Sequence, residues 1–329
     1  MKKILNAPAD YTDDMLKGIY AANSDQVRYA ADCLRCYCTA KKTEGKVAIV
    51  TGGGTGHLPL FLGYVGEGML DGCAVGSVFQ SPSAEQIFEV TKAVEAGAGV
   101  LYLFGNYTGD TMNFEMSSEF CEMEDIETRM VIGADDVNSG APEVRRGVAG
   151  IFFLYKAAGA KAAQMGTLEE VAAAAEKAKA ATRTVGFALT PCVIPEVGHP
   201  NFVLKEGEMA MGMGIHGEPG IWNGPILTSA QIADESLKTL LADMPLAEGE
   251  EVALLVNGLG GTSVEELYIL CGDVIERLKE KGVKVYRSFV GEYATSMEMM
   301  GASISLCRLD AELKEYIDYP VHTPFYTQV

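Results

Sequence analysis

The stretch KVAIVTGGGTGHLP, residues 46–59, decides the fold class. Its first half, residues 46–52, is a short apolar run that predicts a strand ending in a glycine loop. Similar short apolar runs lie at 73–79, 99–106 and 128–135, with helical stretches between them. Strands that alternate with helices are typical of an α/β fold. We therefore expect two α/β domains, each with a mainly parallel or mixed sheet flanked by helices.

The length of the chain predicts the division into two domains. With 329 residues it is longer than one hydrophobic core usually supports. An alanine-rich helix is expected at 167–181, and the strand expected at 184–189 begins a second unit. We place the boundary near residue 183, which gives an N-terminal domain of residues 1–183 and a C-terminal domain of residues 184–329.

The charge of the chain narrows the classes of partner. Its formal net charge is −19. Nucleic acid and anionic membrane surfaces repel so negative a protein, so we expect neither as a partner. The sequence shows no signal peptide and no transmembrane run, and its eight cysteines are few for this length. Together these features predict a cytoplasmic protein.

Three of the cysteines, Cys33, Cys36 and Cys38, follow the spacing C-x-x-C-x-C. A structural zinc site needs four ligands, and no second Cys/His pair follows this group. Buried cysteine is commonly a small apolar residue. We therefore expect buried thiols on a helix and no bound metal, with a metal site as the alternative.

His216 lies in GMGIHGEPG, residues 212–220, and is one of four histidines in the chain. The surrounding glycines lack side chains that would crowd the imidazole ring. Glu218 is close enough in sequence to orient one of the ring nitrogens. A histidine held open on a loop is well placed to contact a ligand. His199 and His322 lie beside proline or threonine and are expected to stabilise turns.

Two further candidates follow expected strands. His57 ends a glycine run whose backbone N–H groups, including those of Gly53 and Gly54, can cradle an anion or a polar ligand. The run lacks the lysine of a phosphate-binding loop, and it is a weak dinucleotide fingerprint. Asp110, in NYTGD, lies where open α/β sheets place their ligand crevice. It is either an acid–base group or the cap of a helix expected from Met112.

Taken together, these motifs resemble the substrate-binding subunit of dihydroxyacetone kinases, and the resemblance covers almost the entire chain. It rests on GGGTGH (52–57), SPS-x-x-QIFE (81–89), NYTGD (106–110), RRGVAG (145–150), GIHGEPG (214–220) and PVHTP (320–324). The resemblance implies a ketose kinase subunit of two α/β domains that is homodimeric in its relatives.

The resemblance also implies a role for each candidate residue. His216 matches the histidine that adds through a ring nitrogen to the substrate carbonyl and forms a covalent hemiaminal. Asp110 would accept the proton of the substrate hydroxyl, while His57 would stabilise charge or share the acid–base role. Gly53 and Gly54 would offer backbone contacts to the substrate. The implied substrate is a short-chain ketose such as dihydroxyacetone, phosphorylated on a terminal hydroxyl.

A second protein is implied as the source of the phosphoryl group. We expect this chain to bind no cofactor of its own, because it lacks a phosphate-binding loop and the helical nucleotide domain of ATP-using single-chain relatives. ADP or ATP with magnesium would lie on a separate helical, DhaL-type subunit. In relatives of this split form, a phosphotransferase-system protein recharges the ADP.

Two positions depart from the family pattern. Leu58 replaces the acidic residue beside His57, and Gly105 stands where the family has a lysine that contacts the substrate. Gly105 is therefore expected to line a larger, less charged pocket. One hypothesis is a kinase subunit for a four-carbon ketose such as erythrulose. The other is a catalytically silent coactivator that senses a ketose through His216.

Retention of both His57 and Asp110 favours the enzyme, because a sensor needs only His216. A third interpretation, a small-ligand-binding protein unrelated to phosphoryl transfer, requires that the three glycine-containing motifs coincide by chance.

Overall fold

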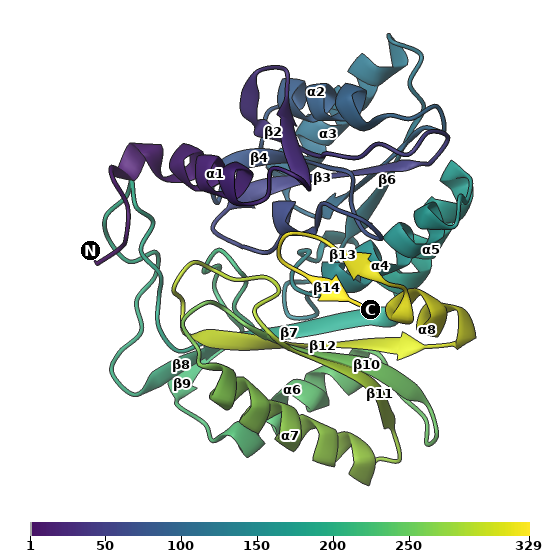
Figure 1. Ribbon diagram of the computed structural model, residues 1–329. Coiled ribbons are helices and arrows are strands. Elements are labelled where there is room, and N and C mark those ends of the chain that lie inside the picture. Colours follow the sequence, from purple (N-terminus) through teal and green to yellow (C-terminus); the bar gives the residue numbers. More distant parts are fainter. Residues whose placement is uncertain (1) are drawn as a thin grey trace. The chain divides into compact units, whose positions relative to one another are not determined.

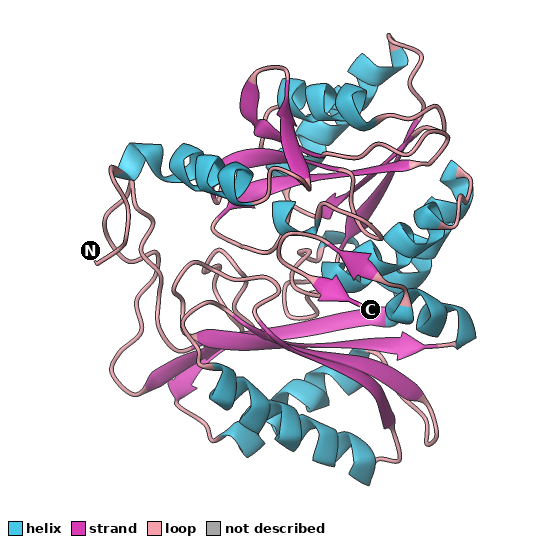
Figure 2. Ribbon diagram, viewed as in Figure 1, coloured by secondary structure: helices cyan, strands magenta, loops and turns pink. Residues whose placement is uncertain are grey.

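The computed structural model describes residues 2–329, which divide into two compact units, each built on a six-stranded sheet (Figures 1 and 2). The first unit comprises Met1–Gly133, Leu154–Lys177 and Glu315–Val329, and the second comprises Ala134–Phe153 and Ala178–Lys314. This division differs from the single boundary expected near residue 183. Residues 134–153 belong to the second unit and residues 315–329 to the first, because each segment is held by contacts with residues far away in sequence.

The sheet of the first unit is mixed, with the order β1-β2-β4-β3-β5-β6. Strands β4, β3, β5 and β6 are parallel to one another, whereas β1 and β2 join the edge in antiparallel pairing. The strands are β1 (Val27–Ala30), β2 (Cys33–Thr39), β3 (Ala48–Thr55), β4 (Gly72–Val78), β5 (Val100–Gly105) and β6 (Thr128–Gly133). The apolar runs therefore predicted β3, β4, β5 and β6 correctly, with small shifts at their ends, but they did not predict β1 or β2.

The glycine run of residues 52–54 is part of β3, so our expectation of a loop there was wrong. Its residues pair in register with β4, Gly53 with Val75 and Gly54 with Gly76. A Cβ atom on Gly53 would lie 2.2 Å from the ring of Phe61, and one on Gly54 would lie 2.6 Å from the backbone nitrogen of Gln80. Glycine within a strand often marks such a close approach.

The three cysteines of the C-x-x-C-x-C group lie on β2, so the expected helix was also wrong. Cys36 and Cys38 are two residues apart and so point to the same face of the sheet. Both are buried in the core beneath helix α2 (Ala84–Val94), which contains Ile87, Val90 and Val94. No group of three metal-ligating side chains gathers anywhere in residues 2–329. The two thiols pack as small apolar groups.

Helices α2 and α3 (Thr108–Glu122) lie together on one face of the first sheet (Figure 1). Helix α2 begins at a capping box, in which Ser83 and Gln86 are bonded reciprocally to each other's backbone N–H groups. The remaining helices of this unit, or shared with the second unit, are α1 (Tyr11–Ala22), α4 (Ile151–Ala163), α5 (Leu168–Ala181) and α8 (Ala311–Asp318). Short 3₁₀ turns occur at Pro8–Asp10 (η1), Leu62–Tyr64 (η2) and Pro142–Val144 (η3).

The C-terminal segment returns to the first unit as a hairpin of β13 (Val321–His322) and β14 (Thr327–Gln328). Lys156 of α4 is fully buried and donates a hydrogen bond of 2.6 Å to the carbonyl of Tyr319. Thr323 donates to the carbonyl of Gly63 at 2.8 Å. These two hydrogen bonds hold the C-terminal segment against the first unit, whose sheet is built from residues 27–133.

The second sheet has the order β11-β10-β12-β7-β8-β9 and is mostly antiparallel. Within the described residues, β10 and β11 form its one parallel pair, and its other neighbouring strands pair in antiparallel fashion. The strands are β7 (Thr182–Ala188), β8 (Glu208–Met211), β9 (Trp222–Pro225), β10 (Glu251–Gly258), β11 (Lys284–Gly291) and β12 (Gly301–Leu309). Both sheets are thus mixed and flanked by helices, as the fold prediction allowed.

Helices α6 (Ser229–Asp243) and α7 (Val264–Glu280) pack side by side on one face of the second sheet (Figure 1). Each begins at a capping box, Thr228 with Gln231 and Ser263 with Glu266. Their buried apolar side chains join those of β7, β10 and β12 in one core. In the described residues, 2–329, no helix is both long and apolar enough to cross a membrane.

A partly buried ion pair attaches the segment Ala134–Phe153 to the rest of the second unit. The guanidinium of Arg145, which is 6% exposed, donates two hydrogen bonds to the carboxylate of Asp243 at 2.5 and 2.9 Å. Arg183 donates to the same carboxylate. The hydrogen bonds from Arg145, with those from Arg183 and both positive charges, outweigh burial and lower the pKa of Asp243 to about 2.

Replacement of Asp243 by alanine should lower the free energy of unfolding by about 3 kcal/mol, because it takes the carboxylate away from a buried guanidinium. Asp234→Ala is the matched control: it is also on α6, but this carboxylate is 59% exposed and pairs with Arg277. The control should cost less than about 1 kcal/mol. Urea denaturation measures both, and equal losses would contradict the prediction.

Candidate functional site

His216 lies on the loop between β8 and β9 of the second unit, and its side chain is 23% exposed. The loop turns at Gly212 and Gly217, whose φ angles of 80° and 81° favour glycine. Asn201 donates a hydrogen bond of 2.8 Å to the carbonyl of His216. The chain thus folds so that the imidazole ring is held on a braced loop and reaches solvent, as the sequence predicted.

Glu218 orients the imidazole ring. The ring Nδ1 of His216 is 2.8 Å from Oε1 of Glu218, and the backbone N–H of His216 donates to Oε2 at 2.9 Å. This confirms the prediction that Glu218 contacts a ring nitrogen. An ionised carboxylate only accepts hydrogen bonds, so the proton resides on Nδ1. In the neutral ring, Nε2 then carries the lone pair that a nucleophile needs.

Glu218 remains ionised at every pH at which the protein is expected to work. Burial raises its pKa, but the hydrogen bond from His216 and the positive charges of His216 and Arg146 outweigh burial and lower the pKa to about 2. A permanent negative charge beside the ring also stabilises positive charge that develops on the imidazole.

In the first unit, three of the sequence motifs meet at the carboxyl edge of parallel strands. His57 follows β3, the SPS segment follows β4, and Asp110 follows β5, which are neighbours in the sheet. Asn113 of α3 donates a hydrogen bond of 2.7 Å to the carbonyl of Pro82. Open α/β sheets place ligands at this edge.

His57 is completely buried between aromatic rings. Its ring stacks on Phe79, with centroids 4.8 Å apart and an angle of 20° between the planes. Phe61 meets it edge-on, at 6.2 Å and 89°. Aromatic packing therefore fixes the plane of this imidazole, and Gly53 provides the space that the ring of Phe61 occupies.

Asp110 is the third residue of α3 and is 6% exposed. The residue at the cap position is Tyr107, so the alternative of Asp110 as a helix cap was wrong. The positive end of the helix dipole favours a carboxylate there. Burial raises the pKa of Tyr155, and the negative charge of Asp110 adds to that rise. Asp110 is thus a buried carboxyl group at the edge of the sheet.

The glycines predicted to contact substrate are placed as follows. Gly53 and Gly54 lie within β3, where packing against Phe61 and Gln80 already requires small residues. Gly105 ends β5, directly before the NYTGD motif. Their contact with a substrate stays a prediction. His57 and Asp110 belong to the first unit, whereas His216 and Glu218 belong to the second.

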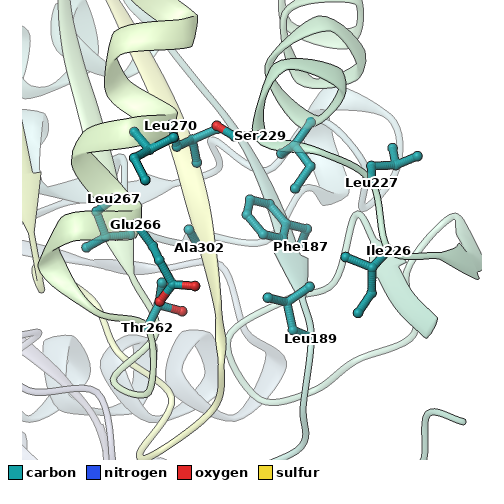
Figure 3. Close-up of a pocket in the computed structure, with 12 residues that line it drawn as sticks. Phe187, Leu189, Ile226, Leu227, Ser229, Thr262, Glu266, Leu267, Leu270 and Ala302 are labelled. Carbon is teal, nitrogen blue, oxygen red and sulfur yellow. The ribbon is translucent and has the colours of Figure 1, made fainter. Parts of the chain in front are cut away.

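An apolar pocket of about 220 Å³ in the second unit involves other residues (Figure 3). It is lined by side chains of β7, β12, α6 and α7, including Phe187 and Leu267, and the oxygens of Thr262 and Glu266 lie together at one end of it. None of the candidate residues lines this pocket. Its polar side chains are Ser229, Thr262 and Glu266, so it lacks the imidazole groups that the sequence singles out.

The sequence interpretation missed Arg146 and Asp136, which lie behind Glu218. Nη1 of Arg146 is 3.7 Å from Oε2 of Glu218, and its Nη2 is 2.7 Å from Oδ2 of Asp136. Arg146 stands in the RRGVAG motif and Asp136 follows an expected strand, so both were visible in the sequence. Nothing local, however, indicated that a residue at 146 meets one at 218.

Comparisons with known proteins identify the family of the chain. The Dak1 domain matches residues 17–325. The dihydroxyacetone-binding subunit DhaK of PTS-dependent dihydroxyacetone kinase 2 from Listeria innocua is 44% identical over 328 residues, which cover 99% of each chain. The D-erythrulose kinase of Mycolicibacterium smegmatis is 42% identical, and the match covers 99% of this chain and 56% of that protein.

A solved structure shows that the resemblance extends to the fold. The dihydroxyacetone kinase operon co-activator Dha-DhaQ matches with a TM-score of 0.90 and 32% identity, over 96% of this chain and 98% of its own. The resemblance to dihydroxyacetone kinase subunits is therefore confirmed over nearly the whole sequence, and the chain belongs to the Dak1 domain family.

Proposed function

We propose that this protein is the ketose-binding subunit of a dihydroxyacetone-type kinase and that His216 holds the substrate as a covalent hemiaminal. The observation that carries the proposal is the 2.8 Å contact between Nδ1 of His216 and Glu218. It directs the lone pair to Nε2, on a ring that reaches solvent. The names of relatives, which include dihydroxyacetone and erythrulose kinases, support a small ketose as the substrate.

In the proposed capture step, Nε2 attacks the carbonyl carbon and forms a C–N bond. The π electron pair of the carbonyl moves to its oxygen, which takes up a proton from solvent. The positive charge left on the ring lies beside the ionised Glu218. Asp110 would then accept the proton of the terminal hydroxyl as the hydroxyl oxygen attacks the γ-phosphorus of ATP brought by a second protein. The bond between that phosphorus and the bridging oxygen would break and ADP would leave, while His57 would stabilise the charge or share the proton transfer.

The proposal includes a second protein that brings the phosphoryl group. ADP or ATP with magnesium would be held by a separate nucleotide-binding subunit, and a phosphotransferase-system donor would recharge ADP there. The PTS-dependent name of the Listeria relative, which matches along its whole length, supports this split arrangement. We also propose a homodimer, by analogy with the family.

A specific observation favours each of two alternatives. Leu58 and Gly105 replace charged residues of the family pattern, and an erythrulose kinase is 42% identical, which favours a four-carbon ketose. The structural match to an operon co-activator favours a ketose sensor without catalysis. Both alternatives keep capture by His216 and differ from the main proposal in what happens to the bound ketose.

Covalent capture is tested by intact-mass measurement after incubation with dihydroxyacetone. The wild type should gain the mass of the whole ketose, because addition to a carbonyl loses no water. His216→Ala should show no gain, whereas His199→Ala, which removes an exposed histidine of the same unit, should behave as the wild type. An adduct that survives in His216→Ala, or no adduct with any small ketose, sinks the proposal.

Phosphoryl transfer is tested with Asp110→Asn in an assay coupled to a purified nucleotide-binding subunit with ATP and magnesium, over dihydroxyacetone and both erythruloses. Loss of the proton acceptor should reduce turnover by roughly 10²–10⁴-fold while the adduct still forms. Glu119→Gln, an exposed carboxylate of the same helix, should retain activity. If adducts form on the wild type but no ketose is phosphorylated, the sensor is the correct function.

A further inference from the structure

We infer that Arg146, anchored by Asp136, is a positioning residue that orients the Glu218 carboxylate and thereby selects the ring nitrogen of His216 that attacks the ketose. The inference rests on the proposed function for its kinetic consequence. Its structural basis is a set of contacts within the second unit. The side chains involved are those of Asp136, Arg146, Glu218 and His216.

Asp136 holds the guanidinium in place. Its Oδ2 accepts from Nε of Arg146 at 3.0 Å and lies 2.7 Å from Nη2. The backbone N–H of Asp136 donates to the carbonyl of Arg146 at 3.1 Å, and Asp136 forms a bridge with Thr184 of β7. The side chain of Asp136 is only 3% exposed. The anchor is therefore buried and is joined to β7 by an isolated β-bridge.

Arg146 in turn spans the loop that carries His216. Nη2 donates to the carbonyl of Gly212 at 3.3 Å, and Nη1 lies 3.7 Å from Oε2 of Glu218. The loop passes over the guanidinium at Gly214, where a Cβ atom would lie 2.7 Å from Nη1 and 2.3 Å from Oε2 of Glu218. The guanidinium thus contacts residues on both sides of His216.

These contacts divide the two oxygens of Glu218 between different tasks. Oε2 accepts the backbone N–H of His216 and faces Arg146, which leaves Oε1 for the imidazole ring. A carboxylate held only by its neighbour two residues away would rotate among several orientations. The positive charge of Arg146 beside Oε2 therefore keeps Oε1 of Glu218 directed at Nδ1 of His216. As a result, Nδ1 keeps its proton.

The electrostatics agree with an ion pair that persists at neutral pH. Burial and the neighbouring Asp135 raise the pKa of Asp136, and Arg146 opposes them, with a result of about 6. Asp136 and Glu218 are consequently both ionised at pH 7.5, with one guanidinium between them. The side chain of Arg146 is 15% exposed, so solvent screens these charges less than it screens surface pairs.

The decisive measurement is the ¹⁵N chemical shifts of the His216 ring at pH 7.5 without ketose, which report the tautomer directly. The wild type should carry its proton on Nδ1. Arg146→Gln should shift the population toward the Nε2–H form and slow adduct formation with dihydroxyacetone roughly tenfold, as loss of an outer residue behind a functional histidine commonly does. Arg146→Lys, which keeps the charge, should recover part of both signals. Arg277→Gln, an arginine of the same unit paired with Asp234, should change neither.

An unchanged tautomer in folded Arg146→Gln overturns the inference, even if its adduct forms slowly. If circular dichroism shows that Arg146→Gln does not fold, Asp136→Asn decides instead, since this isosteric change weakens the anchor and leaves the arginine in place. Failure of the wild type to form any adduct would count against the proposed function alone, because the tautomer is measured without a substrate.

Discussion

The ion pair between the buried Arg145 and the partly exposed Asp243 is the constraint on which the placement of His216 depends. It fixes the segment Ala134–Phe153, which follows the last strand of the first unit in sequence but belongs to the second. The next residue, Arg146, then contacts Asp136 and Glu218. Ion pairs exposed on the surface would stabilise these contacts only weakly, but the guanidinium groups of Arg145 and Arg146 are mostly shielded from water.

The two units contribute different chemistry, and each builds its part from closely approaching backbone. In the first, the glycines of β3 allow Phe61 and the segment after β4 to close around His57. In the second, the absence of a side chain at Gly214 leaves room for the Glu218 carboxylate and the Arg146 guanidinium to approach each other beneath the loop that carries His216. Each candidate histidine is thus held by packing or charge in the absence of a ligand, which would reduce the entropy lost in reaching a reactive geometry.

Covalent capture would explain how a small site selects its substrate. A molecule held through a hemiaminal must carry a ketone or an aldehyde, so polyols such as glycerol are excluded by their chemistry and not by their size. The bond also retains a small ketose that offers few other groups for recognition. Leu58 and Gly105 would bear on the remaining specificity, because the family pattern has an acidic residue beside His57 at the first position and a substrate-contacting lysine at the second. The same capture serves a kinase or a sensor, and Asp110 separates the two functions.

The alternation of strands and helices, the capping boxes and the contact of Glu218 with His216 follow from local sequence, because each depends on residues a few positions apart. Long-range contacts, in contrast, place the glycines of 52–54 and the cysteines of 33–38 in strands, make the second sheet mostly antiparallel and assign two segments to different units from their neighbours in sequence. The tertiary structure alone brings Arg146 to Glu218. Strand pairing, burial and ion pairs of this kind join residues distant along the chain, and no local pattern encodes the partner that each will meet.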